Sequence, residues 1–192
     1  MCWAALDRGV KLAPTIGAER DAKRWSEVRD TIRAAILERG WSDRAGAYAQ
    51  AFGSDELDAS ALMMPIVGFL PADDPRMRAT IEAVSSGLTD ERGLVYRYKA
   101  HDGLPGEEGV FGICTYWLVQ CLAMLGQVDR AKELFETMTS FGNDVGLFSE
   151  EVDPASGEAL GNFPQAFTHI GLVNAAWAIA QAEESTSEGG DP

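Results

Sequence analysis

The sequence predicts an all-α protein in which helices alternate between the inner and outer layers of an α/α toroid. Motifs recur about every 53 residues: the ERG at 38–40 returns at 91–93, and Gly146 lies a further 53 residues along. Amphipathic segments alternate with segments that are apolar on every side. A helix that is apolar all round is buried on both sides, whereas an amphipathic helix covers a core from outside. Such alternation at a fixed period is typical of helical hairpins that stack into a ring.

About seven helices are expected along the chain. The amphipathic set is expected at about 21–38, 75–88 and 128–141. The apolar set is expected at about 1–13, 58–69, 110–125 and 163–183. Gly40, Gly93 and Gly146 follow helical patterns and are expected in the left-handed conformation that ends helices. Residues 184–192 are polar and acidic and are expected to form a disordered tail.

The long segments that join an outer helix to the next inner helix are expected to emerge together at one end of the ring. A site would form at that shared end. In the segment LFSEEVDPASGEALGNFPQAFTHIG (147–171), Glu150 and Glu151 follow the apolar Leu147 and Phe148, an unusual setting for solvated charges. Arg97 lies 53 residues before Glu150, so it is expected at the equivalent position of the preceding loop.

Composition excludes several functions. The chain has 30 acidic and 16 basic residues, a formal net charge of -14, whereas nucleic acids and anionic membranes bind clustered Lys and Arg. Its three cysteines match no disulfide framework or zinc pattern, and no metal site is expected. Unpaired cysteines favour a reducing, cytoplasmic location. The stretch VFGICTYWLVQCLAMLG is short for a membrane span and is expected to be a buried helix.

Four motifs connect the chain to a known family. They are MCWAALDR (1–8), LDASALMMPIVGFLP (57–71), DGLPGEEGVFGICTYWLV (102–119) and SEEVDPASGEALGNFPQAFTHIGLVNAA (149–176). With these motifs the chain resembles the C-terminal part of the bacterial glycoside hydrolase family 15, the glucoamylase-like (α/α)6 barrels that include glucoamylases and some trehalases. The resemblance implies that residues 1–183 are the C-terminal portion of such a catalytic domain, a partial toroid that lacks about five of twelve helices.

The resemblance also implies a reaction. Members of the family hydrolyse terminal α-glucosidic bonds with inversion, using a general acid and a general base about 6.5–9.5 Å apart, so that water fits between base and sugar. The family motif assigns the base to Glu150. The general acid belongs to a Trp-Glu-x-Arg loop just before the helix that begins MCW, so the resemblance places the acid outside this chain. No metal or organic cofactor is needed.

Candidate substrate-binding residues have alternatives that the sequence leaves open. Arg97 is either a ligand for sugar hydroxyls or a surface arginine. Glu107 and Glu108, in GLPGEEG, match a family loop close to the pocket. Glu151 either binds sugar or points elsewhere, and Gln165 either binds sugar or caps a helix. Starch-like, isomaltose-type and trehalose substrates are not separated.

A second function remains open at this point. Exposed inner helices would equally suit a non-catalytic helical-repeat module that binds a protein partner. An open ring is also expected to expose apolar flanks, which favour self-association or pairing with the missing N-terminal half.

Overall fold

The computed structural model describes residues 1–99 and 108–188. The helices are α1 (Cys2–Ile16), α2 (Glu19–Arg39), the 3-10 helix η1 (Ala59–Leu62), α3 (Met63–Ile66), α4 (Pro75–Gly87), α5 (Gly112–Met124), α6 (Val128–Thr139) and α7 (Ala166–Glu188). The strands are β1 (Trp41–Ser42), β2 (Ala47–Tyr48), β3 (Val110–Phe111), β4 (Glu151–Val152) and β5 (Ala159–Leu160).

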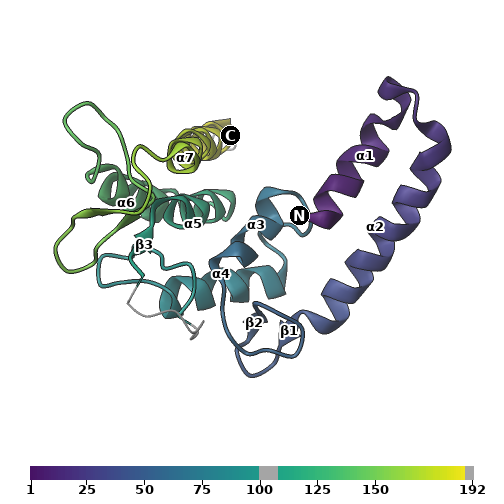
Figure 1. Cartoon of the computed structure of the whole chain (residues 1–192), viewed down its shortest axis with the longest axis horizontal. Helices are drawn as coiled ribbons and strands as arrows, with labels where there is room; N and C mark the ends of the chain where they lie inside the picture. Colours follow the sequence, from purple (N-terminus) through teal and green to yellow (C-terminus); the bar gives the residue numbers. More distant parts are fainter. Residues whose placement is uncertain (100–107, 189–192) are drawn as a thin grey trace.

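The helices form an arc with two layers. Figure 1 shows α7, α5, α3 and α1 along the concave side, with α6, α4 and α2 outside them. The predicted alternation of inner and outer helices is therefore confirmed. Its cause is visible in the burial of side chains. The outer helix α6 buries one face, through Ala131, Leu134 and Met138, whereas the inner helix α5 is buried along nearly its whole length.

Helix α5 is the centre of the core, packed between α6 and α7. Two glycines let α5 and α7 approach closely. A Cβ atom on Gly112 would lie 2.6 Å from Cγ2 of Thr168, and one on Gly171 would lie 3.1 Å from Cβ of Tyr116. A larger side chain at Gly112 would therefore force the two helices apart at the end where the long loops meet them.

The α1–α2 hairpin stands apart at the other end of the arc (Figure 1). Its main apolar anchor is Trp3, whose ring meets Phe69 edge to face at 5.0 Å between centroids. Within the hairpin, the buried Asp7 carboxylate binds Lys11 at 2.8 Å and Arg8 at 2.6 Å. The hydrogen bond from Lys11 is the main cause that lowers the pKa of Asp7, against the opposing effect of burial.

Several expected elements differ in detail. The segment 58–69 is not one helix but the short η1 followed by the single turn α3. The Asp58 carboxylate begins the turn by accepting from the Ser60 N–H at 2.7 Å. Gly68, with φ +74°, ends it, and Phe69 N–H donates to the Met64 carbonyl at 2.8 Å. The chain therefore has too few residues between the two caps for a long helix.

Two further expectations need correction. Gly40 ends α2 in the right-handed conformation, with φ -83°, because the chain turns directly into β1. Helix α7 continues to Glu188, so residues 184–188 extend a helix that the sequence analysis ended at 183. The remaining residues of the expected tail, 189–192, lie outside the described part of the chain.

The 53-residue repeat is visible in hydrogen bonds. Asp90 and Asn143 begin matching turns, in which each side chain accepts from the N–H groups two and four residues later. Gly93 and Gly146 complete these turns with φ of +82° and +76°, a conformation that glycine adopts without strain. They therefore serve loop turns one repeat apart, not the helix ends that the sequence suggested.

Candidate active site

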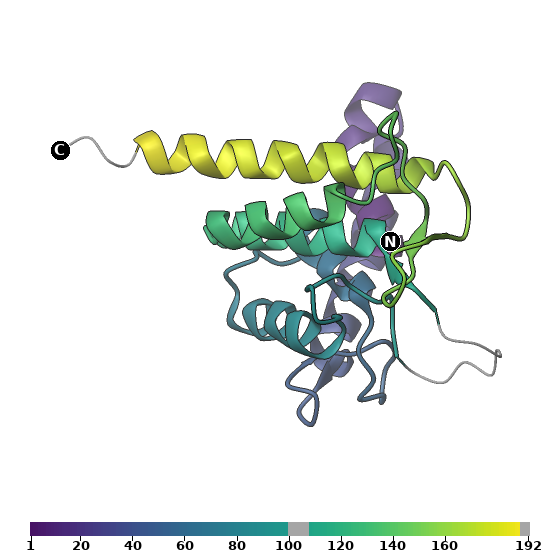
Figure 2. The ribbon, with the colours of Figure 1, turned by 90° about the vertical axis from the view of Figure 1, so that its left-hand side faces the viewer.

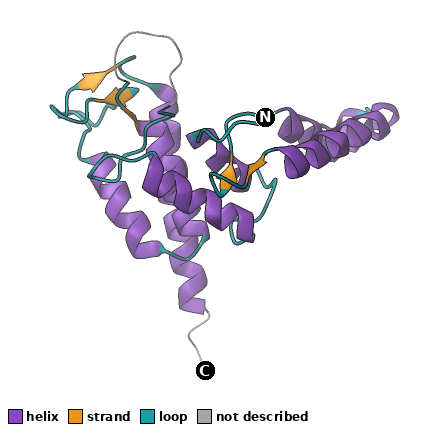
Figure 3. Ribbon diagram, turned by 90° about the horizontal axis from the view of Figure 1, so that it is seen from below, coloured by secondary structure: helices purple, strands orange, loops and turns teal. Residues whose placement is uncertain are grey.

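The long loops meet at one end of the inner helices. Figure 2 shows the 88–99 and 140–165 segments and the chain's first residue at this end, with the C-terminus at the other. A small antiparallel sheet, β3–β4–β5, joins the two loops, and Figure 3 shows its strands within them. In this sheet Phe111 pairs with Glu151, which in turn pairs with Leu160. The sheet thus fixes the SEE segment beside the start of α5.

Arg97 and Glu150 hold equivalent positions, as the repeat predicts. The Arg97 carbonyl accepts a hydrogen bond from the Ala59 N–H at 2.9 Å, and the Glu150 carbonyl accepts one from the Gly112 N–H at 3.1 Å. Donors and acceptors are both shifted by 53 residues. Each loop is therefore tied to the first turn of the preceding inner helix, and both residues lie at the same end of the arc.

Glu150 is held by the β5 side of its own hairpin. One carboxylate oxygen, Oε2, accepts from the Asn162 backbone N–H at 3.1 Å and from its side-chain Nδ2 at 2.8 Å. Gly161, with φ +70°, allows this approach, since a Cβ there would lie 2.9 Å from Oε2. Among the described residues, no hydrogen bond involves Oε1. A half-buried carboxylate with one fixed oxygen and one open oxygen suits a group that accepts a proton from water.

Glu151 points to a different neighbour. Its Oε2 accepts from the Gly109 N–H at 2.9 Å, across the β3–β4 edge. Glu150 directly precedes β4, in which Glu151 is the first residue, and the two glutamates accept from different donors. Burial raises the pKa of Glu151, the Gly109 N–H opposes this rise, and the charges of Glu108 and Glu150 add to it. The SEE pair therefore contains two carboxylates in different environments.

Two other predicted residues, Arg97 and Glu108, have exposed side chains. Arg97 is exposed, with its guanidinium 5.4 Å from the centre of the Tyr98 ring. Glu108 is also exposed. Burial raises the pKa of the Cys114 thiol, in the first turn of α5, and the charges of Arg97, Glu108 and Glu151 all act on it. Glu107 lies outside the described residues.

Gln165 is close to the SEE segment, as expected. Its backbone N–H donates to the Phe148 carbonyl at 2.9 Å, which ties the start of α7 to the residues just before Glu150. Its side-chain Oε1 accepts from the Phe167 N–H at 3.4 Å. The structure thus shows the helix-capping interaction that the sequence left open. One turn later, His169 Nδ1 donates to the Gln165 carbonyl, 2.7 Å away.

Asn162 was not among the residues predicted from the sequence. Its signal was nonetheless present, because Asn162 lies 53 residues after Gly109, and both backbone N–H groups donate to a carboxylate of the SEE pair. The 53-residue repeat predicted the helices and the position of Arg97, but it was not used to predict the hydrogen-bond donors to the two glutamates.

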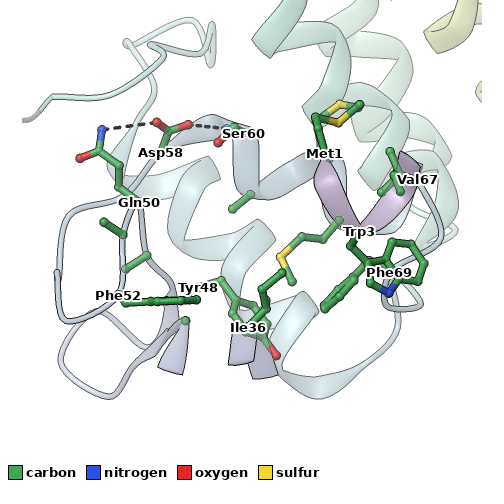
Figure 4. A pocket seen from close by; sticks show the side chains of 17 residues that line it. Met1, Trp3, Ile36, Tyr48, Gln50, Phe52, Asp58, Ser60, Val67 and Phe69 are labelled. Carbon is green, nitrogen blue, oxygen red and sulfur yellow. Dashed lines mark hydrogen bonds between the residues drawn. The ribbon is translucent and has the colours of Figure 1, made fainter. Parts of the chain in front are cut away.

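A hollow of about 490 Å³ opens beside this end, between the start of α1, the loop after β2 and η1 (Figure 4). Its walls carry the apolar side chains of Trp3, Phe52 and Phe69, and its rim carries Gln50 and Asp58. Gln50 Nε2 donates to Asp58 at 3.4 Å. Apolar walls with a polar rim suit a pyranose ring, which has apolar faces and polar edges. Sequence analysis did not select these residues, since they come from three separate segments.

The described residues do not support a metal centre or a membrane span. Within 1–99 and 108–188, no three His, Cys, Asp or Glu side chains are grouped as metal ligands. In the same ranges, no helix has the length and apolar character that crossing a membrane requires.

The chain is similar to known proteins in both sequence and fold. The family described as Glycosyl hydrolases family 15 matches residues 1–177. A trehalase of Mycobacterium tuberculosis is 49% identical over 193 residues, which cover 99% of this chain and 28% of that protein. A trehalase of Thermoplasma volcanium is 36% identical over 182 residues, which cover 95% of this chain and 29% of that protein. The chain thus spans less than a third of the length of these curated relatives.

Two solved structures share the architecture. One described as "Glycosidase Wild Type" has a TM-score of 0.73 at 22% identity, over 93% of this chain and 51% of its own. A bacterial glucoamylase complexed with acarbose has a TM-score of 0.79 at 19% identity, over 94% of this chain and 32% of its own. At such identities the likeness shows the fold alone, and that fold is the partial (α/α)6 toroid. Because the family match spans most of its length, the chain belongs to glycosyl hydrolase family 15.

Proposed function

We propose that the loop end of this arc forms part of the active site of an inverting α-glucoside hydrolase, with Glu150 as the general base. The single observation that carries the proposal is the pair of hydrogen bonds that position the Glu150 carboxylate. Two Asn162 donors fix Oε2, and Oε1 stays open at the end where the loops converge. A carboxylate placed in this way can remove a proton from a water molecule beside its open oxygen.

The proposed step uses the two carboxyl groups of inversion. Oε1 of Glu150 takes a proton from the attacking water, while a general acid protonates the leaving glycosidic oxygen. We assign that acid to no residue of this chain. Since the relatives are more than three times as long as their matched region, we propose that the acid comes from the rest of the family fold. The reaction needs no cofactor.

The remaining candidates are proposed as substrate contacts. Arg97 stands one repeat before Glu150 and can donate to sugar hydroxyls from the adjacent loop. Glu108, Glu151 and Gln165 are proposed as further contacts from the neighbouring segments, and Glu107, which lies outside the described residues, is proposed from its motif alone. We propose an α-glucoside as substrate, and trehalose as the first to test, because the relatives at 49% and 36% identity are trehalases. Free cysteines at 2, 114 and 121 support a cytoplasmic location.

The test is a chimera in which this chain replaces the matched 193-residue region of the M. tuberculosis trehalase. Glucose release from trehalose and maltose is measured. We expect activity in the chimera and none in the isolated chain. Glu150→Gln keeps shape and hydrogen bonding but cannot accept a proton, and should lower kcat by about 10²–10⁴-fold.

Glu151→Gln is the matched control in the same chimera. This substitution should lower kcat clearly less than Glu150→Gln does, or it should act mainly on KM. If Glu150→Gln retains normal kcat while Glu151→Gln abolishes it, the assignment within the SEE pair is wrong. Activity of the isolated chain would show that it carries its own general acid.

A further inference from the structure

The hollow at the start of α1 has a polar side and an apolar side. Figure 4 shows Gln50, Asp58 and Ser60 together along its upper edge, above the rings of Tyr48 and Phe52. Its volume of about 490 Å³ lies within the range of about 300–1,000 Å³ that is typical of small-molecule sites. The hollow is therefore large enough for a small ligand that has one polar edge and one apolar face.

Asp58 is buried with few partners of its own. The residue is 8% exposed, and it lines the hollow. Its Oδ1 accepts from the Ser60 N–H at 2.7 Å, but its Oδ2 has only a long hydrogen bond, at 3.4 Å, from Gln50 Nε2. Within 1–99 and 108–188, no lysine or arginine forms an ion pair with Asp58.

Asp7 shows how the same fold treats another buried aspartate. Asp7 is 6% exposed, and its carboxylate forms ion pairs with Arg8 at 2.6 Å and with Lys11 at 2.8 Å. Burial of a carboxylate is costly unless it is paired or fully hydrogen-bonded. Asp58 therefore keeps a capacity to accept hydrogen bonds that the described part of the chain leaves largely unused, in the wall of a cavity.

The neighbouring polar groups indicate the chemical class of the ligand. Among the described residues, no hydrogen bond involves the Ser60 hydroxyl or Gln50 Oε1. A hydroxyl both donates and accepts, an amide does the same, and a carboxylate accepts. A ring that carries several hydroxyl groups can satisfy all three side chains at its edge, while its apolar face covers Phe52. This combination describes a sugar.

The hollow lies next to the loop that carries Arg97. The Ala59 N–H, directly after Asp58, donates to the Arg97 carbonyl at 2.9 Å, and Glu150 occupies the equivalent position on the next loop. Neighbouring packed helices are about 8–10 Å apart, which is similar to the length of two linked sugar rings. A two-ring substrate with one ring at Glu150 can therefore extend its second ring toward the hollow.

We propose that the hollow binds a glucose ring and that Asp58 selects this ring, by accepting hydrogen bonds from its hydroxyl groups through Oδ2. Gln50 and Ser60 add hydrogen bonds at the same edge, and the aromatic wall covers one face of the ring. The bound ring is the leaving half of a two-ring α-glucoside. That role rests on the proposed function, whereas the binding of glucose does not.

A binding experiment tests the site without any catalysis. The isotope-labelled chain is titrated with glucose, and NMR follows the Gln50 side-chain amide and the Ser60 N–H. We expect saturable shifts, and Asp58→Asn should raise the Kd about tenfold, because it replaces the Oδ2 acceptor and keeps Oδ1 for the Ser60 N–H. Asp74→Asn is the matched control. Asp74 caps α4 and does not line the hollow, so the Kd should stay within about twofold.

Ser60→Ala is a second variant, chosen because it spares the fold. The Ser60 side chain is exposed, and its removal breaks no hydrogen bond among the described residues. We expect the Kd for glucose to rise about threefold, with an unchanged midpoint of thermal unfolding. Glucose that produces no saturable shifts in the native chain would overturn the proposal. So would an equal Kd in the native chain, Asp58→Asn and Ser60→Ala. Shifts caused by methylammonium and not by glucose would make the occupant a cation, which also overturns it.

Kinetics of the trehalase chimera test the role of the bound ring. Asp58→Asn should raise the KM for trehalose about tenfold and leave kcat within about threefold. The KM for 4-nitrophenyl α-glucoside should stay within about twofold, because its leaving group carries no sugar hydroxyls. A merely structural effect would change both substrates equally, and that result would overturn the assignment to the leaving ring. An inactive chimera, with glucose still bound through Asp58 in the isolated chain, would refute the proposed function and leave the glucose site standing.

Discussion

The main-chain carbonyls of Arg97 and Glu150 accept equivalent hydrogen bonds, one 53-residue repeat apart. The donors are the N–H groups of Ala59 and Gly112, at 2.9 and 3.1 Å. Each bond fixes a loop residue over the first turn of the preceding inner helix. Arg97, with its positive side chain, and Glu150, the candidate base, are therefore held on adjacent loops by equivalent backbone hydrogen bonds. Their relative position depends on the spacing of the inner helices.

Asn162 should control how Glu150 works. In the chimera, Asn162→Ala removes the 2.8 Å side-chain donor and leaves the backbone donor in place. We expect kcat to fall about 10–100-fold with KM within twofold, since a hydrogen bond to a charged group contributes about 1.5–3 kcal/mol. Steady-state kinetics on trehalose measure both constants.

Asn143→Ala is the control for Asn162. It removes two side-chain hydrogen bonds from the same loop between α6 and α7, and neither of them reaches Glu150. If both variants lose kcat equally, general loosening of the loop explains the effect and the specific role of Asn162 is refuted.

Thr168 should stabilise the loop that holds Glu150. Its buried hydroxyl donates to the Ser149 carbonyl at 2.9 Å, immediately before Glu150. Thr168→Val keeps the shape and leaves that carbonyl without this donor, so the free energy of unfolding should fall by about 1–3 kcal/mol. Urea denaturation of the isolated chain measures it. Thr31→Val, on the exposed side of α2, should change it by less than about 0.5 kcal/mol. Equal midpoints for the two variants would contradict the prediction.

Glu151 should make stability fall as pH rises. Burial raises the pKa of Glu151 in the folded state above the ordinary value of 4.5. Its contribution is therefore full below pH 4.5 and is lost as pH rises through the higher folded value. Glu151→Gln removes this titration, so the variant should gain stability relative to the native chain on going from pH 4.5 to pH 7. A difference in unfolding free energy that stays constant with pH would refute it.

Asp7 should make stability fall as pH falls. Hydrogen bonds from Lys11 and Arg8 lower the pKa of Asp7 below the ordinary value of 3.8. Its contribution is present above pH 3.8 and is lost as pH falls through the folded value. Asp7→Asn should cost about 1 kcal/mol at pH 7, because water screens the half-exposed partners, and nearly nothing in strong acid. Urea titrations at both pH values measure this, and an equal cost at both would contradict it.

Much of the fold could be predicted because it depends on local pattern. Helix α5 is apolar on every side and is buried on every side, while α6 is striped and packs through its stripe. The 53-residue register placed Arg97 and Glu150 correctly on adjacent loops. Periodicity of side chains determines which face a helix buries, so these features need no knowledge of distant contacts.

The short α3 could not be predicted from the pattern of apolar residues alone. An apolar run at 58–69 suits a long helix, but the Asp58 cap and the left-handed Gly68 confine it to η1 and one further turn. Such limits arise from backbone hydrogen bonds at the ends of the segment, which composition does not reveal. Similarly, the glycines at 93 and 146 were expected at helix ends and instead serve matching loop turns.

The sequence by itself determined the helical class, the repeat, the family and the presence of two adjacent glutamates at the loop end. Only the tertiary structure decided which neighbour each glutamate meets. Glu150 turns to Asn162 across its own hairpin, and Glu151 turns to Gly109, which directly precedes β3 and lies 42 residues away in the chain. The physical reason is that these neighbours are set by a sheet, which is assembled from segments distant in sequence.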